Sequence, residues 1–428
     1  MSRDALGRVE SVSPAVAGGA LRGFAIDNPV AGETLSVYET MVRGWVLGRE
    51  RQVRAVRVLD PTVGQVIREA GLKEHRPDVA AHFPGVAAAA HSGFQIRFSL
   101  LNLQTENPVD VVAVLDDGGI VELGRLVYTR QRLETGFQPV LQPLMVSSLG
   151  RSGSSWLMHL LGRHPDIVVH GEHPYESRLC KYYVHNLLRT LSEPPETLSP
   201  AYDDELFAVN THWLTAELPL DTDQYRRFRR EHLENLARFC QQETDAVYLE
   251  VAGGQGKRPR FFAEKHGAGH TARLLGELYP DSREIILVRD FRDMYCSVRD
   301  FNRRRGRSDF GMDRAAPGED LLQVTARRAA GLACSYRSRR RDVFLLRYEE
   351  LVRDPERRLQ ETLEHIGIDG GADLVRDLVR GAGADFAHGT SADGLSSIGR
   401  WKRDLGADER ERSSLAFEQA LSAFGYHV

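Results

Sequence analysis

A short loop rich in glycine and serine, Gly-Arg-Ser-Gly-Ser-Ser at 150–155, follows the apolar run Leu-Met-Val-Ser-Ser-Leu at 144–149. In a strand–loop–helix unit the first N–H groups of the helix are unpaired, and together with the helix dipole they form a site for an anion. Gly153 lets the backbone approach a ligand, and Arg151 adds a fixed positive charge. The hydroxyl donors of the loop are Ser152, Ser154 and Ser155. The pattern predicts an anion-binding loop, although a serine-rich helix cap without a ligand has the same composition.

A second candidate lies farther along the chain, where an apolar run ends in an arginine. Arg289 follows Glu-Ile-Ile-Leu-Val at 284–288, and Ser297 comes eight residues later in a helical pattern. Ligands of open parallel sheets bind beyond the carboxyl ends of the strands, and a planar guanidinium suits a phosphate. Arg289 and Ser297 therefore predict a second anion contact. Mutual pairing of the arginine and aspartate side chains at 289–293 on the surface is the alternative.

The elements around these residues predict two domains. Residues 1–135 contain short segments rich in Val, Ile and aromatic residues between turn signals, which is typical of a small all-β sandwich. Residues 136–143 are the expected linker. From 144 to 428, apolar runs of four to six residues alternate with helical patterns, which predicts an α/β fold whose parallel sheet is covered by helices on both faces. The strands of this sheet are expected at 144–149, 167–170, 247–252, 284–288 and 343–347.

Composition argues against several classes of function. The formal net charge of −4 speaks against bulk nucleic-acid binding, which needs a basic surface. The four cysteines are widely spaced and form no metal-ligand pair, as in the reduced thiols of a cytoplasmic protein. No segment resembles a signal peptide, and no run approaches the ~20 apolar residues of a membrane helix. We therefore expect a cytoplasmic protein without a transmembrane segment and leave a homo-oligomer open.

Four segments, in the expected order, resemble the sulfotransferases that use 3′-phosphoadenosine 5′-phosphosulfate (PAPS). Residues 150–157, GRSGSSWL, resemble the family's 5′-phosphosulfate loop, and residues 287–297, LVRDFRDMYCS, resemble its 3′-phosphate motif. Residues 344–368 resemble the strand and helix that follow. Residues 396–405, SSIGRWKRDL, resemble the late element that closes over the nucleotide.

The resemblance extends from Leu144 to Gly425 and implies a three-layer α/β fold of the P-loop-like type, PAPS as co-substrate and no metal. It also implies roles for individual residues. Arg151 would stabilise charge on the leaving group, while Arg289 and Ser297 would hold the 3′-phosphate. The other donor contacts that it implies are Ser152, Gly153, Ser154, Ser155, Trp156, Gly399, Arg400, Trp401 and Lys402. Trp401 is equally compatible with a role as a core anchor.

A base must lie within hydrogen-bond reach of the acceptor hydroxyl. The segment at 170–176, His-Gly-Glu-His-Pro-Tyr-Glu, follows an apolar strand and should emerge at the same sheet edge as the loop. By resemblance to the bacterial and carbohydrate branches Glu172 is the leading candidate, before His173, with Glu176 and His170 also open. Lys265 resembles a lysine that some carbohydrate sulfotransferases place near the transferring sulfate. A solvated lysine in a glycine-rich loop is the alternative for Lys265.

The acceptor and the rest of the chain are less closely defined. Residues 1–135 weakly resemble modules fused to bacterial glycosyltransferases, which favours a hydroxyl of a glycan, glycolipid or secondary metabolite as acceptor. Residues 181–245 are expected to be mostly helical and to shape the acceptor pocket, and the basic run at 303–309 is interpreted as solvated surface. Two other functions stay open. One is a small-molecule or nucleotide kinase, against which the missing Gly-Lys-Ser/Thr loop ending argues; the other is a non-catalytic carbohydrate-binding protein with a degenerate enzyme domain.

Overall fold

A computed structural model describes most of the chain, and its contacts divide the chain into two units. The first unit comprises Met1–Gly136 and Tyr183–Phe239, and the second comprises Phe137–Tyr182 and Cys240–Val428. The predicted boundaries at 135 and 144 stay predictions. The described residues are 5–16, 18–35, 38–192, 222–267, 270–312, 315, 318–339, 343–382 and 394–427.

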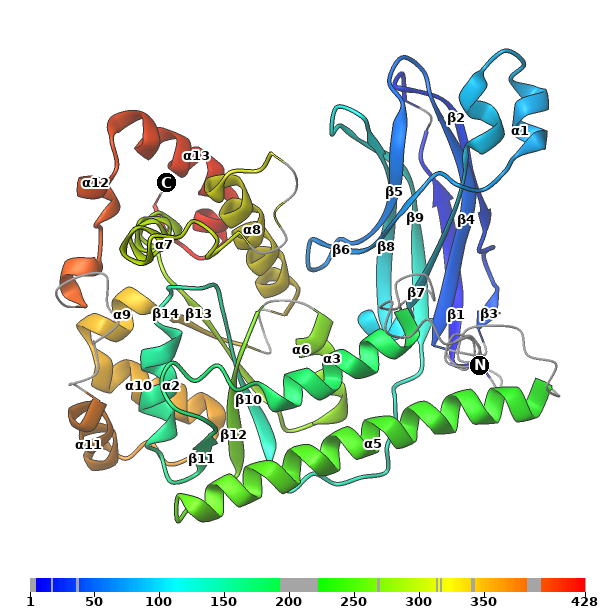
Figure 1. Ribbon diagram of the computed structural model, residues 1–428. Coiled ribbons are helices and arrows are strands. Elements are labelled where there is room, and N and C mark those ends of the chain that lie inside the picture. Colours follow the sequence, from blue (N-terminus) through cyan, green and yellow to red (C-terminus); the bar gives the residue numbers. More distant parts are fainter. Residues whose placement is uncertain are drawn as a thin grey trace. The chain divides into compact units, whose positions relative to one another are not determined.

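The first unit is built on two antiparallel sheets that share one apolar core, as predicted for residues 1–135 (Figure 1). Alternate side chains of each sheet enter this core, for example Val42 and Val46 from one and Val109 and Val111 from the other. The larger sheet has the order β3 (Thr34–Leu35), β1 (Gly7–Pro14), β9 (Ile120–Arg130), β8 (Glu106–Leu115), β5 (Val53–Asp60) and β6 (Gln65–Gly71). The smaller has the order β2 (Leu21–Asn28), β4 (Glu39–Gly48) and β7 (Gly93–Ser99). One short helix, α1 (Pro77–His82), interrupts the strands.

The second unit contains the predicted parallel sheet. Its order is β11 (Ile167–Val169), β12 (Phe261–His266), β10 (Gln142–Ser148), β13 (Arg283–Val288) and β14 (Phe344–Arg347), and every neighbouring pair is parallel. Strand β10 lies between β12 and β13, so the loop that follows it emerges near the middle of the carboxyl edge. This is the position where open parallel sheets bind ligands.

One predicted strand is wrong. Residues 247–252 lie in helix α5 (Thr222–Gly254), and the place in the sheet belongs to β12, Phe261–His266. The buried residues of α5 recur at helical spacing and are Leu233, Ala237, Cys240, Gln241, Thr244, Asp245, Tyr248 and Ala252. The Val and Tyr content of residues 247–252 suggested a strand, but the buried residues that recur at helical spacing along α5 show why this segment is helical.

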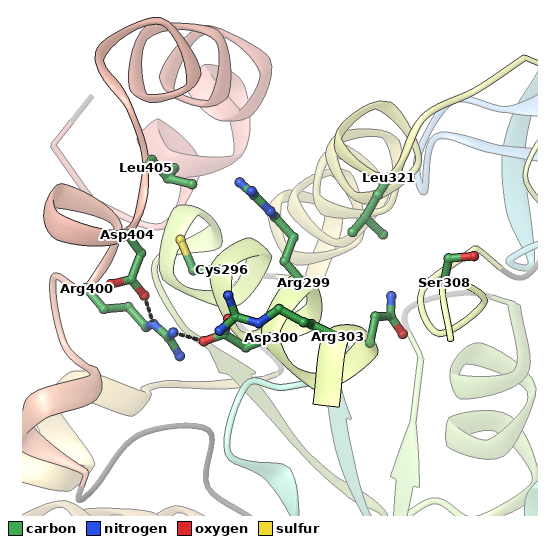
Figure 2. A pocket seen from close by; sticks show the side chains of 10 residues that line it. Cys296, Arg299, Asp300, Arg303, Ser308, Leu321, Arg400, Asp404 and Leu405 are labelled. Atoms are coloured by element: carbon green, nitrogen blue, oxygen red, sulfur yellow. Dashed lines mark hydrogen bonds and ion pairs between the residues drawn. The ribbon is translucent and has the colours of Figure 1, made fainter. Parts of the chain in front are cut away.

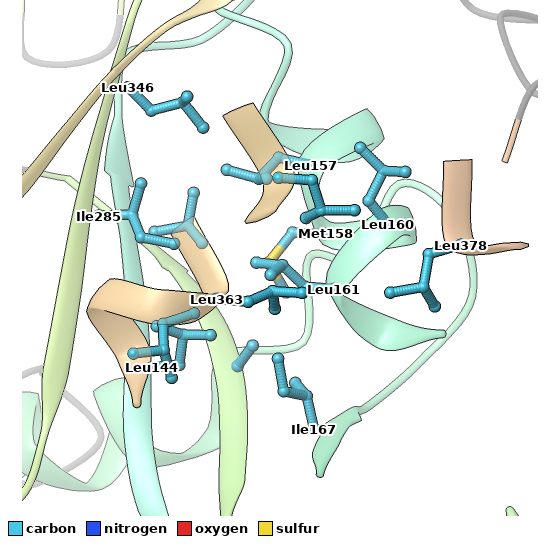
Figure 3. Packing of buried hydrophobic residues seen from close by; sticks show 14 of the residues in the cluster. Leu144, Leu157, Met158, Leu160, Leu161, Ile167, Ile285, Leu346, Leu363 and Leu378 are labelled. Carbon is cyan, nitrogen blue, oxygen red and sulfur yellow. The ribbon is translucent and has the colours of Figure 1, made fainter. Parts of the chain in front are cut away.

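Helices cover both faces of the parallel sheet. In β13, Ile285 and Leu287 enter one core with helix α2 (Figure 3). Ile286 and Val288 enter a second core on the opposite face. The first core contains α2 (Ser154–Gly162), α9 (Tyr348–Arg353), α10 (Pro355–Ile366) and α11 (Ala372–Ala382). The second contains α7 (Phe291–Arg305), α8 (Leu321–Arg339) and α13 (Ala407–Ala423). The unit therefore has the three-layer α/β fold expected from the sequence.

The remaining helices complete the second unit or extend beyond it. They are α3 (Leu179–Ser192), α6 (His270–Leu278), the short η5 (Leu395–Ser397) and α12 (Trp401–Asp404). Much of the predicted helical stretch at 181–245 is described as α3 and α5, while residues 193–221 lie outside the described residues. Within the described part of the chain, no helix has the length and apolar character needed to cross a membrane.

Candidate active site

The loop between β10 and α2 has a backbone that glycine makes possible. Gly153 has φ 92°, in the left-handed region, and a β-carbon there would come within 2.5 Å of the Tyr348 ring. Arg151 also has a left-handed φ, of 69°. Gly153 is also the N-cap residue of α2 and offers no side chain to bind the first turn. The N–H groups of that turn therefore remain available to another acceptor. Ser152 is buried, and its Oγ lies 3.6 Å from the Met294 sulfur.

The structure brings the two predicted anion motifs together. The Arg289 guanidinium donates to the carbonyl oxygen of Arg151 at 3.3 Å and to that of Ser397 at 2.6 Å. Arg151 Nε in turn donates to Ser297 Oγ at 3.3 Å. Arg289 is only 5% exposed, stacks on the Tyr348 ring at 4.8 Å, and leaves its Nε without a hydrogen-bond partner among the described residues. A buried donor without a partner is suited to an incoming acceptor.

Positive charge accumulates around the loop. Burial lowers the pKa of Arg151, and the charges of Arg289, Arg304 and Arg305 lower it further. Like charges held this close together repel one another, and an anion bound between them would relieve that repulsion. Arg304 and Arg305 belong to the basic run that the sequence suggested was merely solvated; they are exposed, yet their charges reach the loop.

Asp293, a residue of α7, fixes the late element beside Arg289. Its carboxylate accepts the backbone N–H of Gly399 at 2.7 Å and that of Trp401 at 2.9 Å. Burial raises the pKa of Asp293 to about 6. The Trp401 ring lies under the Arg292 guanidinium at 4.0 Å, and exposed Lys402 lies 5.6 Å from that ring. The backbone of Gly399 and Trp401 thus adjoins the two anion motifs.

Arg400 points elsewhere. It pairs with Asp404 at 2.6 Å and with Asp300, and these residues line a pocket of about 560 Å³ on another flank of α7 (Figure 2). The other α7 residues of this pocket are Cys296, Arg299, Asn302 and Arg303, and it is completed by Ser308, Leu321 and Leu405. Arg299 pairs with Glu409 at 2.9 Å and Arg303 with Asp300 at 2.9 Å. Its three arginines therefore already have carboxylate partners.

Lys265 forms hydrogen bonds both to helix α2 and to the segment 170–176 that contains the candidate bases. It lies in β12 and is 5% exposed, so the alternative of a solvated loop lysine is wrong. Its Nζ donates to Ser155 Oγ at 2.8 Å, to Glu176 Oε1 at 2.9 Å and to the carbonyl oxygen of Pro174. Burial lowers the pKa of Lys265, while Glu176 acts in the opposite direction. Lys265 thus contributes another cation near the start of α2.

The candidate bases differ in whether their side chains already have interaction partners. Glu172 is exposed, and among the described residues its carboxylate has no hydrogen-bond or ion-pair partner. The His173 ring lies 5.8 Å from that of Tyr175, and His170 Nδ1 lies 2.5 Å from Ser177 Oγ. Glu176 pairs with both Lys265 and Arg178. Glu172 therefore keeps a carboxylate that an acceptor hydroxyl could reach.

The sequence did not single out the buried residues that hold these parts in place. Glu264 accepts the N–H groups of Cys180 and Lys181, at 2.7 and 3.1 Å, and the Tyr248 hydroxyl at 2.6 Å, which fixes the start of α3 just after the candidate bases. Tyr348 supports both Gly153 and Arg289. A carboxylate next to Lys265 in an apolar segment was the available signal for Glu264. In the described residues, no group of three or more His, Cys, Asp or Glu side chains is arranged to hold a metal ion.

Comparison with known proteins places the chain in a family. The sequence matches the model of the sulfotransferase family over residues 143–371, more than half of the chain. The chain belongs to the sulfotransferase family. The matched range includes the loop, Lys265, Arg289 and Ser297. No curated protein sequence matched this sulfotransferase chain.

Solved sulfotransferases resemble the chain at low sequence identity. Sulfotransferase STF9 from Mycobacterium avium is 17% identical, with 68% of this chain and 79% of that chain covered and a TM-score of 0.36. The sulfotransferase domain from the curacin biosynthetic pathway is 18% identical, with 68% and 99% covered and a TM-score of 0.38. Mouse sulfotransferase SULT7A1, complexed with PAP, is 12% identical, with 67% and 87% covered and a TM-score of 0.34.

Proposed function

We propose that this sulfotransferase moves a sulfuryl group from PAPS to a hydroxyl of a glycan, glycolipid or secondary metabolite. The observation that carries the proposal is the meeting of Arg289 and Ser297 with Arg151 at the carboxyl edge of the sheet. Two anion contacts from separate strand ends fit a donor with phosphates at both its 3′ and 5′ positions. The proposal includes a cytoplasmic location, catalysis without a metal ion and domain boundaries at 135 and 144.

The residues present fit such a donor. The first turn of α2, behind Gly153, would hold the 5′-phosphate, and Arg289 has a buried Nε available for the 3′-phosphate. When bound, PAPS supplies the sulfuryl group and a good leaving group. Arg151 and Lys265 would stabilise the charge that develops on the leaving oxygen. In the balanced reaction one S–O bond to the phosphate breaks and one S–O bond to the acceptor forms.

The acceptor proton needs a base, and we assign this role to Glu172. Its unpaired carboxylate is exposed and follows β11, whose carboxyl end lies at the same edge as the loop. Glu176 is the second candidate, but its ion pair with Lys265 would have to open first. Removing a general base commonly reduces turnover by about 10²–10⁴-fold. We therefore expect Glu172→Gln to lose turnover to this extent while its affinity for PAP, the 3′,5′-bisphosphate product, stays unchanged.

The direct test is incubation with labelled PAPS and a panel of sugar and small-molecule alcohols, with release of PAP as the readout. PAP should also raise the melting temperature of the protein. If PAP neither binds nor appears as a product, the proposal is wrong. Stabilisation by ATP with magnesium, but not by PAP, would favour the kinase alternative. Glycan binding without turnover would favour the non-catalytic one.

A further inference from the structure

Two phenylalanines form a platform beside the anion-binding loop. The rings of Phe301, on α7, and Phe310 lie 4.8 Å apart in an edge-to-face arrangement. A β-carbon at Gly150, the first residue of the loop, would lie 3.1 Å from the Phe310 ring. Phe310 nevertheless remains 36% exposed. An exposed aromatic pair in contact with a catalytic loop is suited to stack against a ligand.

Two arginines flank this platform. The guanidinium of Arg151 lies 4.8 Å from the centroid of the Phe301 ring, and that of Arg305 lies 4.3 Å from the same centroid. Arg305 is the last residue of α7, and Gly306 ends the helix with φ 62°. One ring thus links the loop arginine to an exposed arginine at the end of the helix.

Arg305 differs from its neighbours in charge compensation. Arg303 pairs with Asp300, Arg299 with Glu409 and Arg400 with Asp300 and Asp404. For Arg305 the described residues offer no carboxylate partner, and its contact is with the Phe301 ring. A guanidinium that is stacked but not ion-paired keeps its planar fork available for an anionic group.

We propose that Phe301, Phe310 and Arg305 form an acceptor subsite, and that the acceptor is an acidic sugar of the uronic-acid type. This inference rests on the proposed sulfotransferase function. The C–H face of a sugar ring packs on an aromatic ring, and a carboxylate accepts two parallel hydrogen bonds from a guanidinium. Contact between Phe310 and Gly150 places such a sugar beside the loop that would hold the donor.

The experiment uses the full chain, with and without saturating PAP. Calorimetry measures binding of a hyaluronan oligosaccharide and of the same oligosaccharide with its carboxylates reduced to alcohols. The wild type should bind the acidic form at least about tenfold more tightly, because a charge-assisted hydrogen bond is lost in the reduced one. Arg305→Gln should abolish this preference, and Phe310→Ala should weaken binding of both forms. Arg303→Gln is the matched control, since that side chain lies on the same turn, is 80% exposed and is paired with Asp300.

Separate outcomes would overturn the inference and the proposed function. Equal binding of both oligosaccharides by the wild type, binding of neither, or an equal effect of Arg303→Gln would overturn the acidic subsite. A loss of PAP affinity in Arg305→Gln, comparable with any loss for the oligosaccharide, would instead assign Arg305 to the donor and also overturn it. Failure of the wild type to bind PAP counts against the proposed function alone, because the oligosaccharide measurements without PAP still report on the subsite.

Discussion

Helix α7 carries charged side chains on two flanks that use them differently. On the pocket flank, Asp300 pairs with Arg303 and Arg400 (Figure 2). On the loop flank, Asp293 binds backbone N–H groups, and Ser297 accepts a hydrogen bond from Arg151. In the first arrangement the charges pair with one another, whereas on the loop flank the described residues offer Arg289 and Arg305 no carboxylate partner. The difference suggests that the pocket flank stabilises the fold and that the loop flank binds an anion.

The strongest challenge to this comparison is Arg289→Ala. Removal of a buried guanidinium from the loop flank should lower affinity for PAP by about 10–100-fold, because charge-assisted hydrogen bonds to the phosphate are lost. Calorimetric titration with PAP measures the change. The free energy of unfolding, from urea denaturation without ligand, shows whether the variant is folded. A folded variant that binds PAP with wild-type affinity would remove the basis for assigning the loop flank to the donor.

Arg400→Ala tests the pocket flank. The change removes the guanidinium that pairs with Asp404 and leaves Asp300 paired with Arg303, so the free energy of unfolding should fall by about 1–3 kcal/mol. Affinity for PAP should fall less than in Arg289→Ala, as measured by the same titration. An equal loss of PAP affinity in the two variants would show that Arg400 contacts the donor. The pocket flank would then also take part in anion binding.

Ser297→Ala refines the assignment of the loop flank. The hydroxyl accepts one hydrogen bond from Arg151 Nε, and in the proposed complex it would also contact the 3′-phosphate. Loss of a single neutral hydrogen-bonding group costs about 1 kcal/mol, so PAP affinity should fall by roughly fivefold. Ser308→Ala, on the pocket flank, is the control and should leave affinity unchanged. Equal affinities of Ser297→Ala and wild type would exclude the hydroxyl as a ligand.

The sequence predicted well where one local pattern determines the structure. The loop at 150–155 and the strand end at Arg289 each depend on a short apolar run followed by polar residues, and both lie where expected. Prediction failed at 247–252 and at β12, because tertiary contacts outweigh local composition there. Strand β12 carries the buried residues Glu264 and Lys265, whose partners come from other segments: Cys180 and Tyr248 donate to Glu264, and Lys265 donates to Ser155 and Glu176. No local pattern reveals those partners.

The sequence also contained no sign that the basic run at 303–309 lies close to the loop at 150–155. A series of arginines after a helix normally indicates solvated surface, and Arg303 fits that expectation. Arg305 departs from it because Phe301, one turn earlier, also contacts Arg151 from a segment about 150 residues away. The contact of Arg151 and Arg305 with the same ring depends on how α7 packs beside the loop.

Asp293→Asn gives the smallest expected effect and tests the loop-flank carboxylate of α7 by its response to pH. Burial, reinforced by Asp290 and opposed by Arg289, raises the pKa of Asp293 from 3.8 to about 6 in the folded protein. Between these values the folded state binds more protons than the unfolded state, so stability falls as pH rises from about 4 to about 6. This contribution is at most about 1.4 kcal/mol per pH unit. The variant, which cannot ionise, should lose it.

Urea unfolding of wild type and Asp293→Asn across that pH range measures the difference between their slopes. Asp373→Asn, which alters a carboxylate that is 95% exposed, is the control and should keep the wild-type slope. Affinity for PAP in Asp293→Asn should fall by less than about tenfold, because the carboxamide oxygen can still accept one of the two N–H groups from the late element. If the slopes of Asp293→Asn and wild type coincide, Asp293 does not titrate in this range, and the hydrogen bonds from Gly399 and Trp401 offset the effect of its burial.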